Sequence, residues 1–378
     1  MSDHTHIIDV RKAFTVEPIA GSQVKITGEI PYEYLRIERS AAIAALGAEI
    51  EIDGFRKGHV PEAILVKRLG EMSILTEMAE RAISHIYHHI LHDFALDAIG
   101  QPKVEITKLA PENPLGLSIT VAVLPTITLP DYAAIAKTKN VEKQTVVITD
   151  TDLEEQIKDI LRRKAAFDRL QQKATANEAR ESGDLPTPET VEQPIQNEAD
   201  LPIPELTDEI ARGLGQPGQF ADVSDFKTKL REHLTIEKTR EAAATHRAAI
   251  TDAIIEGASV ELPQVLIDSE LTQMFGQMEE DLTRANLKLD DYLAHIKKTK
   301  ADLRAEWQPA AEKRAKLQLI LNEIAKKENI TPDVTELKEQ VAGLMERYKD
   351  ADERRVALYV ASVLTNEAVM KHLENLTT

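Results

Sequence analysis

One short stretch of this sequence combines residue types that could bind a partner directly. Residues 54–61 read Gly-Phe-Arg-Lys-Gly-His-Val-Pro, so two glycines and a proline bracket an aromatic ring and two cations. Glycine tolerates positive φ and proline ends helices and strands, so the stretch predicts a shaped turn between two helical segments. Arg56 and Lys57 suit phosphates or acidic side chains, and Phe55 suits an apolar slot or a stacked base. From periodicity alone, the more usual interpretation is a basic surface turn in which the side chain of Phe55 packs back against the protein.

The same eight residues resemble a family signature. Gly-Phe-Arg-Lys-Gly-x-Val-Pro is similar to the ribosome-docking signature of bacterial trigger factor, the chaperone family that meets nascent chains at the polypeptide exit tunnel. The resemblance implies docking on the protein and RNA rim of that tunnel by one set of residues: Phe55, Arg56, Lys57, Gly54, Gly58 and Pro61. His59 stands where the family commonly has lysine, so one full charge is missing at neutral pH. This departure implies docking that is weaker or more sensitive to pH.

Further phrases extend the resemblance over nearly the whole chain except about residues 173–200. Leu129-Pro130-Asp131-Tyr132 resembles the family's exit from its tail domain. Residues 204–209 resemble the re-entry into the substrate-binding domain, and residues 260–270 resemble the start of an arm helix. Family members commonly carry a peptidyl-prolyl isomerase domain of the FK506-binding type between these parts. The stretch 173–204 is too short and too polar to build one, because domains that small rarely fold without disulfides or a bound metal.

The composition limits the classes of function that remain. The 378 residues are 29% charged and only 4% aromatic, which is typical of long helices with modest cores. The net charge of −18 disfavours general nucleic-acid binding, so any RNA contact needs a small local basic patch. The chain has no cysteine, which excludes disulfides, thiolate metal sites and cysteine-based catalysis.

Nothing in the sequence predicts a membrane segment. Residues 1–10 lack the basic and apolar regions of a secretory signal, and no stretch approaches the 18 apolar residues that a spanning helix needs. We therefore expect a soluble, cytoplasmic protein.

The first 130 residues predict an α+β N-terminal domain, an antiparallel sheet with a helix–loop–helix hairpin. Residues 4–17 are a weak strand candidate, and residues 24–30 alternate apolar and polar side chains as a half-buried strand does. A helix is expected from Pro31 to about Ile52, and a second from about Pro61 to Ala98 with a break at Gly70. Alternation around residues 104–106 and 117–123 adds two more strands. Helices on one face of an antiparallel sheet are therefore expected.

The middle of the chain predicts a connection and then a linker. Residues 141–148 read as a polar, strand-like segment, and Thr151 with Glu154 forms a capping box for a helix that runs to about Gln172. Residues 173–204 contain five prolines and no aromatic residue, which predicts a flexible linker.

The remainder predicts an elongated all-α C-terminal domain. Thr207 is the expected N-cap of the first helix, and Thr331 with Pro332 is expected to cap a later one. Long helices are expected near residues 226–256 and 351–373. The chain is thus multidomain, with the parts 1–130, 131–172, 173–204 and 205–378.

Catalytic and metal chemistry find little support. Four histidines at residues 85, 88, 89 and 92 lie at helical spacing, yet no carboxylate completes a zinc-protease motif, so a solvated helix face is the favoured interpretation. No phosphate-binding glycine loop and no acid–base dyad stand out. We expect no metal and no cofactor.

An apolar stripe in the second half admits two interpretations. Ile267, Leu271, Met274 and Met278 recur at helical spacing. Packing between helices is the default, whereas partial exposure would suit a weak, sequence-tolerant binder of unfolded chains, for which methionine is adaptable. They are the candidate substrate-binding residues.

The resemblance implies an ATP-independent chaperone without isomerase activity. It would dock at the ribosome, shield nascent or unfolded polypeptides in a helical cradle, and form a homodimer when free. Two other classes stay open at this stage: a divergent peptidyl-prolyl isomerase, and a dedicated helical scaffold for one partner.

Overall fold

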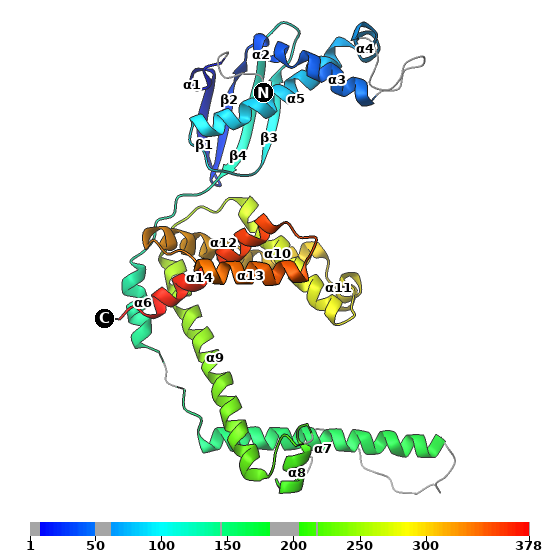
Figure 1. Cartoon of the computed structure of the whole chain (residues 1–378), viewed down its shortest axis with the longest axis vertical. Helices are drawn as coiled ribbons and strands as arrows, with labels where there is room; N and C mark the ends of the chain where they lie inside the picture. Colours follow the sequence, from blue (N-terminus) through cyan, green and yellow to red (C-terminus); the bar gives the residue numbers. More distant parts are fainter. Residues whose placement is uncertain (1–7, 50–61, 144–145, 182–203, 217, 378) are drawn as a thin grey trace. The chain divides into compact units, whose positions relative to one another are not determined.

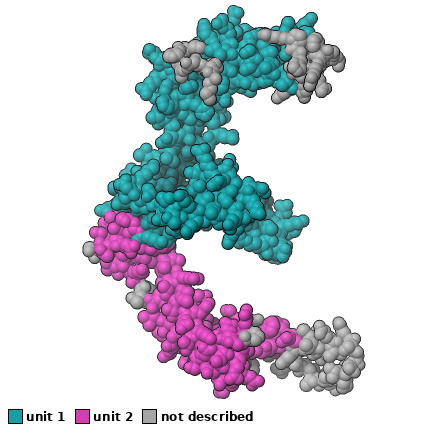
Figure 2. All heavy atoms as spheres, in the orientation of Figure 1, with its two compact units in different colours: residues 1–132, 253–371 teal, residues 133–252, 372–378 magenta. Residues whose placement is uncertain are grey.

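The fold is seen in a computed structural model that describes residues 8–49, 62–143, 146–181, 204–216 and 218–377. The chain divides into two units, one formed by residues 1–132 with 253–371 and the other by residues 133–252 with 372–378 (Figure 2). Each unit is described by itself below.

The first unit begins with a four-stranded antiparallel sheet (Figure 1). Its strands are β1 Phe14–Ile19, β2 Gln23–Ile30, β3 Ala98–Lys108 and β4 Leu115–Val123, and their spatial order is β1-β2-β4-β3. The expected strands at 24–30, 104–106 and 117–123 are confirmed, but the weak candidate at 4–17 is only partly a strand, because a short helix, α1 Val10–Ala13, precedes β1.

Alternation of side chains fixes the register of this sheet. Val24, Ile26 and Ile30 of β2 are buried on one face, and Ile26 lies opposite Ile119 of β4. Gly28 is required for close packing, because a Cβ there would stand 2.3 Å from the carbonyl oxygen of Ala13.

Helices pack on the sheet and complete its core. They are α2 Tyr32–Ile37, α3 Arg39–Glu49, α4 Glu62–Leu69 and α5 Glu71–Asp93. The core includes Tyr34, Ile74, Met78 and Ile86, all exposed by 1% or less. The predicted α+β region is therefore correct.

The helix expected from Pro31 to Ile52 is wrong in one respect, because it is two helices with a break at Glu38. The carboxylate of Glu38 is buried, and its Oε1 lies 3.0 Å from Nδ1 of His85. The expected break at Gly70 is confirmed, and its φ of 84° is open to glycine at no cost.

The rest of the first unit is helical. It contains the last turn of α9 Val223–Gly257, then α10 Gln264–Arg284, α11 Leu289–Ile296, α12 Lys300–Lys327, α13 Val334–Arg347 and most of α14 Glu353–Glu374. Helices α10 and α12 pack against each other. Buried residues of α12 such as Ala315, Ile320 and Ile324 line its inner face.

The second unit is built from helices too. They are α6 Tyr132–Val141, α7 Asp150–Glu181, α8 Asp208–Gly213 and most of α9. Leu153, Ile157 and Leu161 of α7 pack with Ala211 of α8 and Phe226 of α9. The two expected long helices after residue 222 are confirmed as α9 and α14.

Capping residues explain where several helices begin. The hydroxyl of Thr207 accepts from the backbone N–H of Ile210, as expected for its N-cap. The other two predicted caps are wrong by one or two residues. At α7 the box is formed by Thr149 and Asp152, and at α13 the cap is Asp333. At α7 the hydroxyl of Thr149 accepts from the backbone N–H of Asp152, and at α13 the carboxylate of Asp333 accepts from the backbone N–H groups of Thr335 and Glu336.

Two predictions in the middle of the chain need correction. The strand-like segment at 141–148 is not a strand in its described residues, because α6 continues through Val141. Helix α7 continues to Glu181 rather than ending near Gln172, since residues 173–181 contain neither proline nor glycine. Residues 182–203, which hold four of the five prolines, lie outside the described residues.

Candidate functional site

The predicted docking residues Gly54, Phe55, Arg56, Lys57, Gly58 and Pro61 lie outside the described residues. Their framework is described on both sides, since α3 ends at Glu49 and α4 begins at Glu62. A Cβ on Gly47 would stand 2.8 Å from the side chain of Leu65, so the absence of a side chain lets α3 and α4 approach closely. The described helices thus form the two arms of the predicted hairpin.

An ion pair connects the start of α3, the first arm of this hairpin, to the start of α5. Arg39 at the start of α3 donates from Nη1 and Nη2 to the two carboxylate oxygens of Glu71 at the start of α5, at 2.5 and 3.2 Å. The guanidinium holds the pKa of Glu71 below its usual value. Because a bidentate pair fixes orientation as well as distance, it helps to set the direction in which the hairpin projects.

The histidines of α5 do not assemble a metal centre. The structure shows no group of three or more potential metal ligands from His, Asp or Glu among the residues it describes. His85 instead contacts the buried carboxylate of Glu38, at the joint between α2 and α3.

The candidate stripe on α10 separates into two pairs. Ile267 and Leu271 are 5% and 1% exposed and pack against Ala311 of α12, so they belong to the interior of the helical region. Met274 and Met278 are half-buried, one and two turns further along the helix. Only this second pair offers surface to a partner.

A shallow groove of about 440 Å³ lies between α10 and the start of α12, lined on α10 by the residues next to the methionines in sequence, Phe275 and Glu279 among them. Phe275 forms part of its wall, and its ring is tilted by 40° against the ring of Trp307, with centroids 4.8 Å apart. Lys300 and Arg304 complete the opposite side, where Lys300 contacts Glu279 at 3.3 Å. The groove therefore combines one aromatic side chain with two cations that are both paired, Lys300 with Glu279 and Arg304 with Asp268.

Several large apolar side chains are exposed at positions that were not predicted from the sequence. In the first unit they include Leu287 and, on α14, Leu358 and Tyr359, which are 66% and 65% exposed. In the second unit they are Val141, Val147, Phe167, Leu170 and Ile236. Phe167 was the detectable case, because an aromatic residue in a stretch crowded with arginine and lysine is unusual in a chain that is 4% aromatic.

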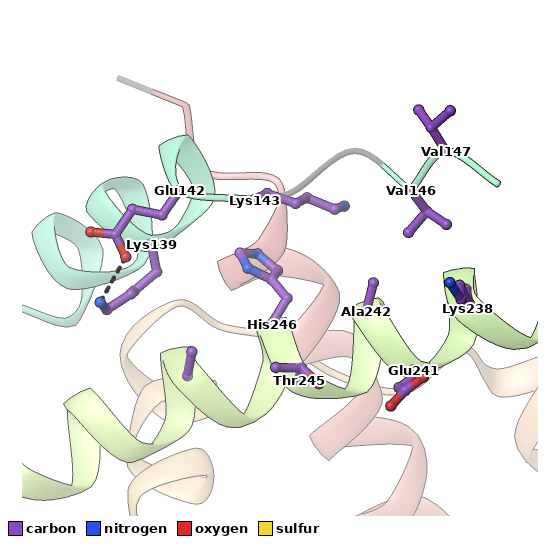
Figure 3. Close-up of a pocket in the computed structure, with 11 residues that line it drawn as sticks. Lys139, Glu142, Lys143, Val146, Val147, Lys238, Glu241, Ala242, Thr245 and His246 are labelled. Atoms are coloured by element: carbon purple, nitrogen blue, oxygen red, sulfur yellow. Dashed lines mark hydrogen bonds and ion pairs between the residues drawn. The ribbon is translucent and has the colours of Figure 1, made fainter. Parts of the chain in front are cut away.

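The second unit holds a pocket of about 440 Å³ between the end of α6, residues 146–147 and one face of α9 (Figure 3). Its wall carries three lysines, but Lys139 pairs with Glu142 at 2.8 Å and Lys238 pairs with Asp152 at 2.8 Å. Figure 3 shows the first of these pairs and Lys143 extending over the pocket. The wall is close to charge balance and is not built for an anion.

Asn140 connects this wall to the end of the chain. Its Nδ2 donates to the carbonyl oxygens of Leu373 and Leu376 at 2.8 and 2.9 Å, so its Oδ1 must be the acceptor toward His246. His246 therefore donates from Nε2, at 2.9 Å. Burial lowers the pKa of His246, and the charge of Lys143 adds to that effect. The imidazole of His246 is therefore neutral at pH 7.

Ion pairs hold the corner between α7 and α9. Lys238 and the Thr149 cap both donate to the carboxylate of Asp152, and these hydrogen bonds hold its pKa far below the usual value. Arg231 of α9 pairs with Asp150 at the start of α7.

Tyr132 anchors the exit from the sheet region within the first unit. It is buried, and its hydroxyl donates to Oε1 of Glu328 at 2.5 Å. Desolvation and that hydrogen bond raise the pKa of Tyr132 to about 12. Lys327 lies over the ring, 4.9 Å from its centroid.

Among the described helices, none combines the length and the apolar character that crossing a bilayer would require.

Comparisons with known proteins match two parts of the chain. A family model described as bacterial trigger factor protein matches residues 12–160, and one described as its C-terminus matches residues 222–374. No model of an FK506-binding-type domain matches between them.

Individual relatives agree with these models. A trigger factor from Moorella thermoacetica is 26% identical over 424 residues, covering 94% of this chain and 92% of that protein. One from a Nocardioides species is 25% identical over 381 residues, covering 86% and 79%. A solved structure concerned with promiscuous substrate recognition by the trigger factor chaperone has 15% identity and a TM-score of 0.47, covering 96% of this chain and all of that chain. Because the two family models together match more than half of its residues, this chain belongs to the trigger factor family.

Proposed function

We propose that this chain is an ATP-independent chaperone that docks at the ribosomal exit tunnel and shields nascent or unfolded polypeptides. The observation that carries the proposal is the Gly54–Pro61 signature on a hairpin whose arms are fixed by α3, α4 and the Arg39–Glu71 pair. Phe55, Arg56 and Lys57 contact the tunnel rim, while Gly54, Gly58 and Pro61 shape the turn. His59 makes the docking weaker above its ordinary pKa than a lysine would.

The proposed parts of the chain have separate tasks. Residues 1–130 dock, residues 131–172 connect, residues 173–204 stand in place of an isomerase domain, and residues 205–378 bind clients. Clients contact Met274, Met278 and the groove between α10 and α12, and Ile267 and Leu271 support that surface from inside the helical region. Burial of apolar surface at several weak contacts drives binding, without nucleotide hydrolysis. The protein acts in the cytoplasm and self-associates as a homodimer when free.

The proposed chaperone has no isomerase activity. The supporting observation is that residues 161–221 carry no match to the isomerase domain, while their described part consists of α7, α8 and turns. Pure protein should not accelerate cis–trans isomerisation of a proline-containing peptide. Turnover above the uncatalysed rate would support the divergent isomerase instead.

Ribosome pelleting tests the docking step. Replacing Phe55-Arg56-Lys57 by three alanines should abolish co-sedimentation, because it removes the apolar contact and both cations. A matched control, Lys67→Ala with Arg68→Ala at the end of α4, removes the same two charges ten residues away. Equal pelleting of the triple variant and the wild type would refute docking through this turn.

Aggregation assays test the shielding step. The wild type should suppress aggregation of several unrelated unfolded proteins in the absence of ATP. Protection of one client only would favour a dedicated scaffold.

A further inference from the structure

Helix α7 carries an exposed patch that the packing of its own unit does not use. Its first three turns pack with α8 and α9 through Leu153, Ile157 and Leu161, and the helix continues beyond α8 (Figure 1). Phe167 and Leu170 lie past that cluster and are 64% and 67% exposed. Such large side chains, one turn apart and open to water, are typical of a binding surface.

Helical geometry places one cation on the same face. Arg163 is four residues before Phe167 and seven before Leu170, so the three side chains share a face and span about 10 Å along the axis. We call Arg163, Phe167 and Leu170 the α7 patch. The buried residue Leu161 points to the other side of the helix.

The patch has an uncompensated positive charge. Residues 158–171 contain five cations and two acids, in a chain whose net charge is −18. Both acids are already paired, Asp159 with Arg162 at 3.3 Å and Asp168 with Lys164 at 3.0 Å. Arg163 forms no ion pair with any residue in the part of the chain that the structure describes.

We propose that the α7 patch binds client segments in which large apolar residues alternate with acidic ones. This inference rests on the proposed chaperone function and names a class of client for it. The apolar side chains of the client cover Phe167 and Leu170, and a client carboxylate pairs with the guanidinium of Arg163. The acidic surface of the rest of the chain repels such segments, so the local cations guide them to this helix.

The chemistry favours a peptide over RNA at this position. Two exposed apolar side chains would contribute little to phosphate binding, and the cations one turn before Phe167 on the helix, Arg163 and the already paired Lys164, do not form a basic stripe. The chain's own residues 182–203 are a competing occupant, because they contain five acids and no cation.

The test uses the full chain and two fluorescent peptides. Both carry the same leucine and phenylalanine residues, one with aspartates between them and the other with lysines. Fluorescence anisotropy at about 50 mM salt should show binding about tenfold tighter for the acidic peptide, and the difference should shrink at about 1 M salt. Equal affinities at low salt would overturn the proposal.

Variants on adjacent residues localise the effect. Arg163→Gln should lower the affinity for the acidic peptide about threefold. Arg162→Gln removes the same charge from a neighbouring, already paired position and should change that affinity little. Phe167→Ala should lower the affinity for both peptides about fivefold, because both make the apolar contact. Equal effects of Arg162→Gln and Arg163→Gln would refute this patch as the site.

Three further outcomes would reassign the surface. A large gain in affinity when the five acids of residues 182–203 are neutralised would make that segment the main occupant. Displacement of the peptide by a single-stranded oligoribonucleotide would indicate RNA, and a dimer dissociated by Phe167→Ala would indicate a second copy. If the chain protects unfolded clients from aggregation but binds the two peptides with equal affinity, only this inference fails. If it protects none, the proposed function fails.

Discussion

The sheet region of residues 8–123 and the helical second unit keep their elements together in different ways. In the sheet region, residues from every strand-facing helix enter one continuous core, and Ile26, Ile74 and Met78 have no exposed surface. In the second unit, a small cluster on the first turns of α7 is supplemented by ion pairs and amide hydrogen bonds. A long helix that is packed along only part of its length keeps more of its apolar side chains free for a partner: Phe167 and Leu170 of α7 are 64% and 67% exposed, whereas Met72 of α5 is 51% exposed.

Core truncations should show the largest difference. Ile86→Ala, in α5, should lower the free energy of unfolding of the sheet region by about 3 kcal/mol, because the side chain is 1% exposed and its cavity is walled on all sides. Leu161→Ala in α7 should lower that of the second unit by about 2 kcal/mol, since the open cluster can collapse further. Hydrogen exchange of the amides of α5 and α7 measures each loss locally. Equal losses would remove the distinction between the two regions.

The α10 stripe provides the next comparison. Leu271→Ala should destabilise the packing of α10 on α12 by about 2 kcal/mol, because the side chain is 1% exposed. Met278→Ala should change stability by less than about 0.5 kcal/mol and should reduce protection of an unfolded client. Thermal unfolding and an aggregation assay on both variants separate the two roles. Loss of stability with Met278→Ala would assign that residue to the interior.

Asn140 tests how far one amide supports the second unit. Asn140→Ala leaves the Nε2–H of His246 and two carbonyl oxygens without their partner, which should lower stability by about 1 kcal/mol. Asn140→Asp keeps an acceptor for His246 but removes both donated bonds, and its negative charge should raise the pKa of His246. Histidine NMR titration follows that shift. An unchanged pKa in Asn140→Asp would contradict the hydrogen bond.

Acid should loosen the second unit in two steps of modest size. The pKa of His246 is lowered on folding, so its contribution is complete above its ordinary value of 6.5 and declines as the pH falls below it. The pKa of Asp152 is lowered too, so its contribution holds above 3.8 and is lost as the pH falls through the folded value. Asp152→Asn should flatten the acid limb of a stability profile below about pH 4. A profile unchanged by this substitution would show that the α7–α9 corner does not depend on the ion pair.

Local patterns were sufficient for most elements of the fold. Alternation in residues 24–30 and 117–123 predicted β2 and β4, and Thr207 was correctly identified as a cap, because each depends on a few neighbouring residues. The break at Glu38 was not predicted, since no neighbouring residue indicates it and the contact of its carboxylate is with His85, 47 residues away. The capping box at Thr149 and the cap at Asp333 were missed because two candidate acceptors lie within two residues of each other, and the final geometry decides between them.

The sequence by itself determined the family signature, the helical and strand periodicities and the absence of cysteine, because these are properties of residue type and spacing. Tertiary structure decided which apolar residues are interior and which are surface. Ile267 and Phe167 both belong to amphipathic helices, yet only the first meets a neighbouring helix. Burial depends on what packs against a side chain, and residues distant in sequence supply that packing.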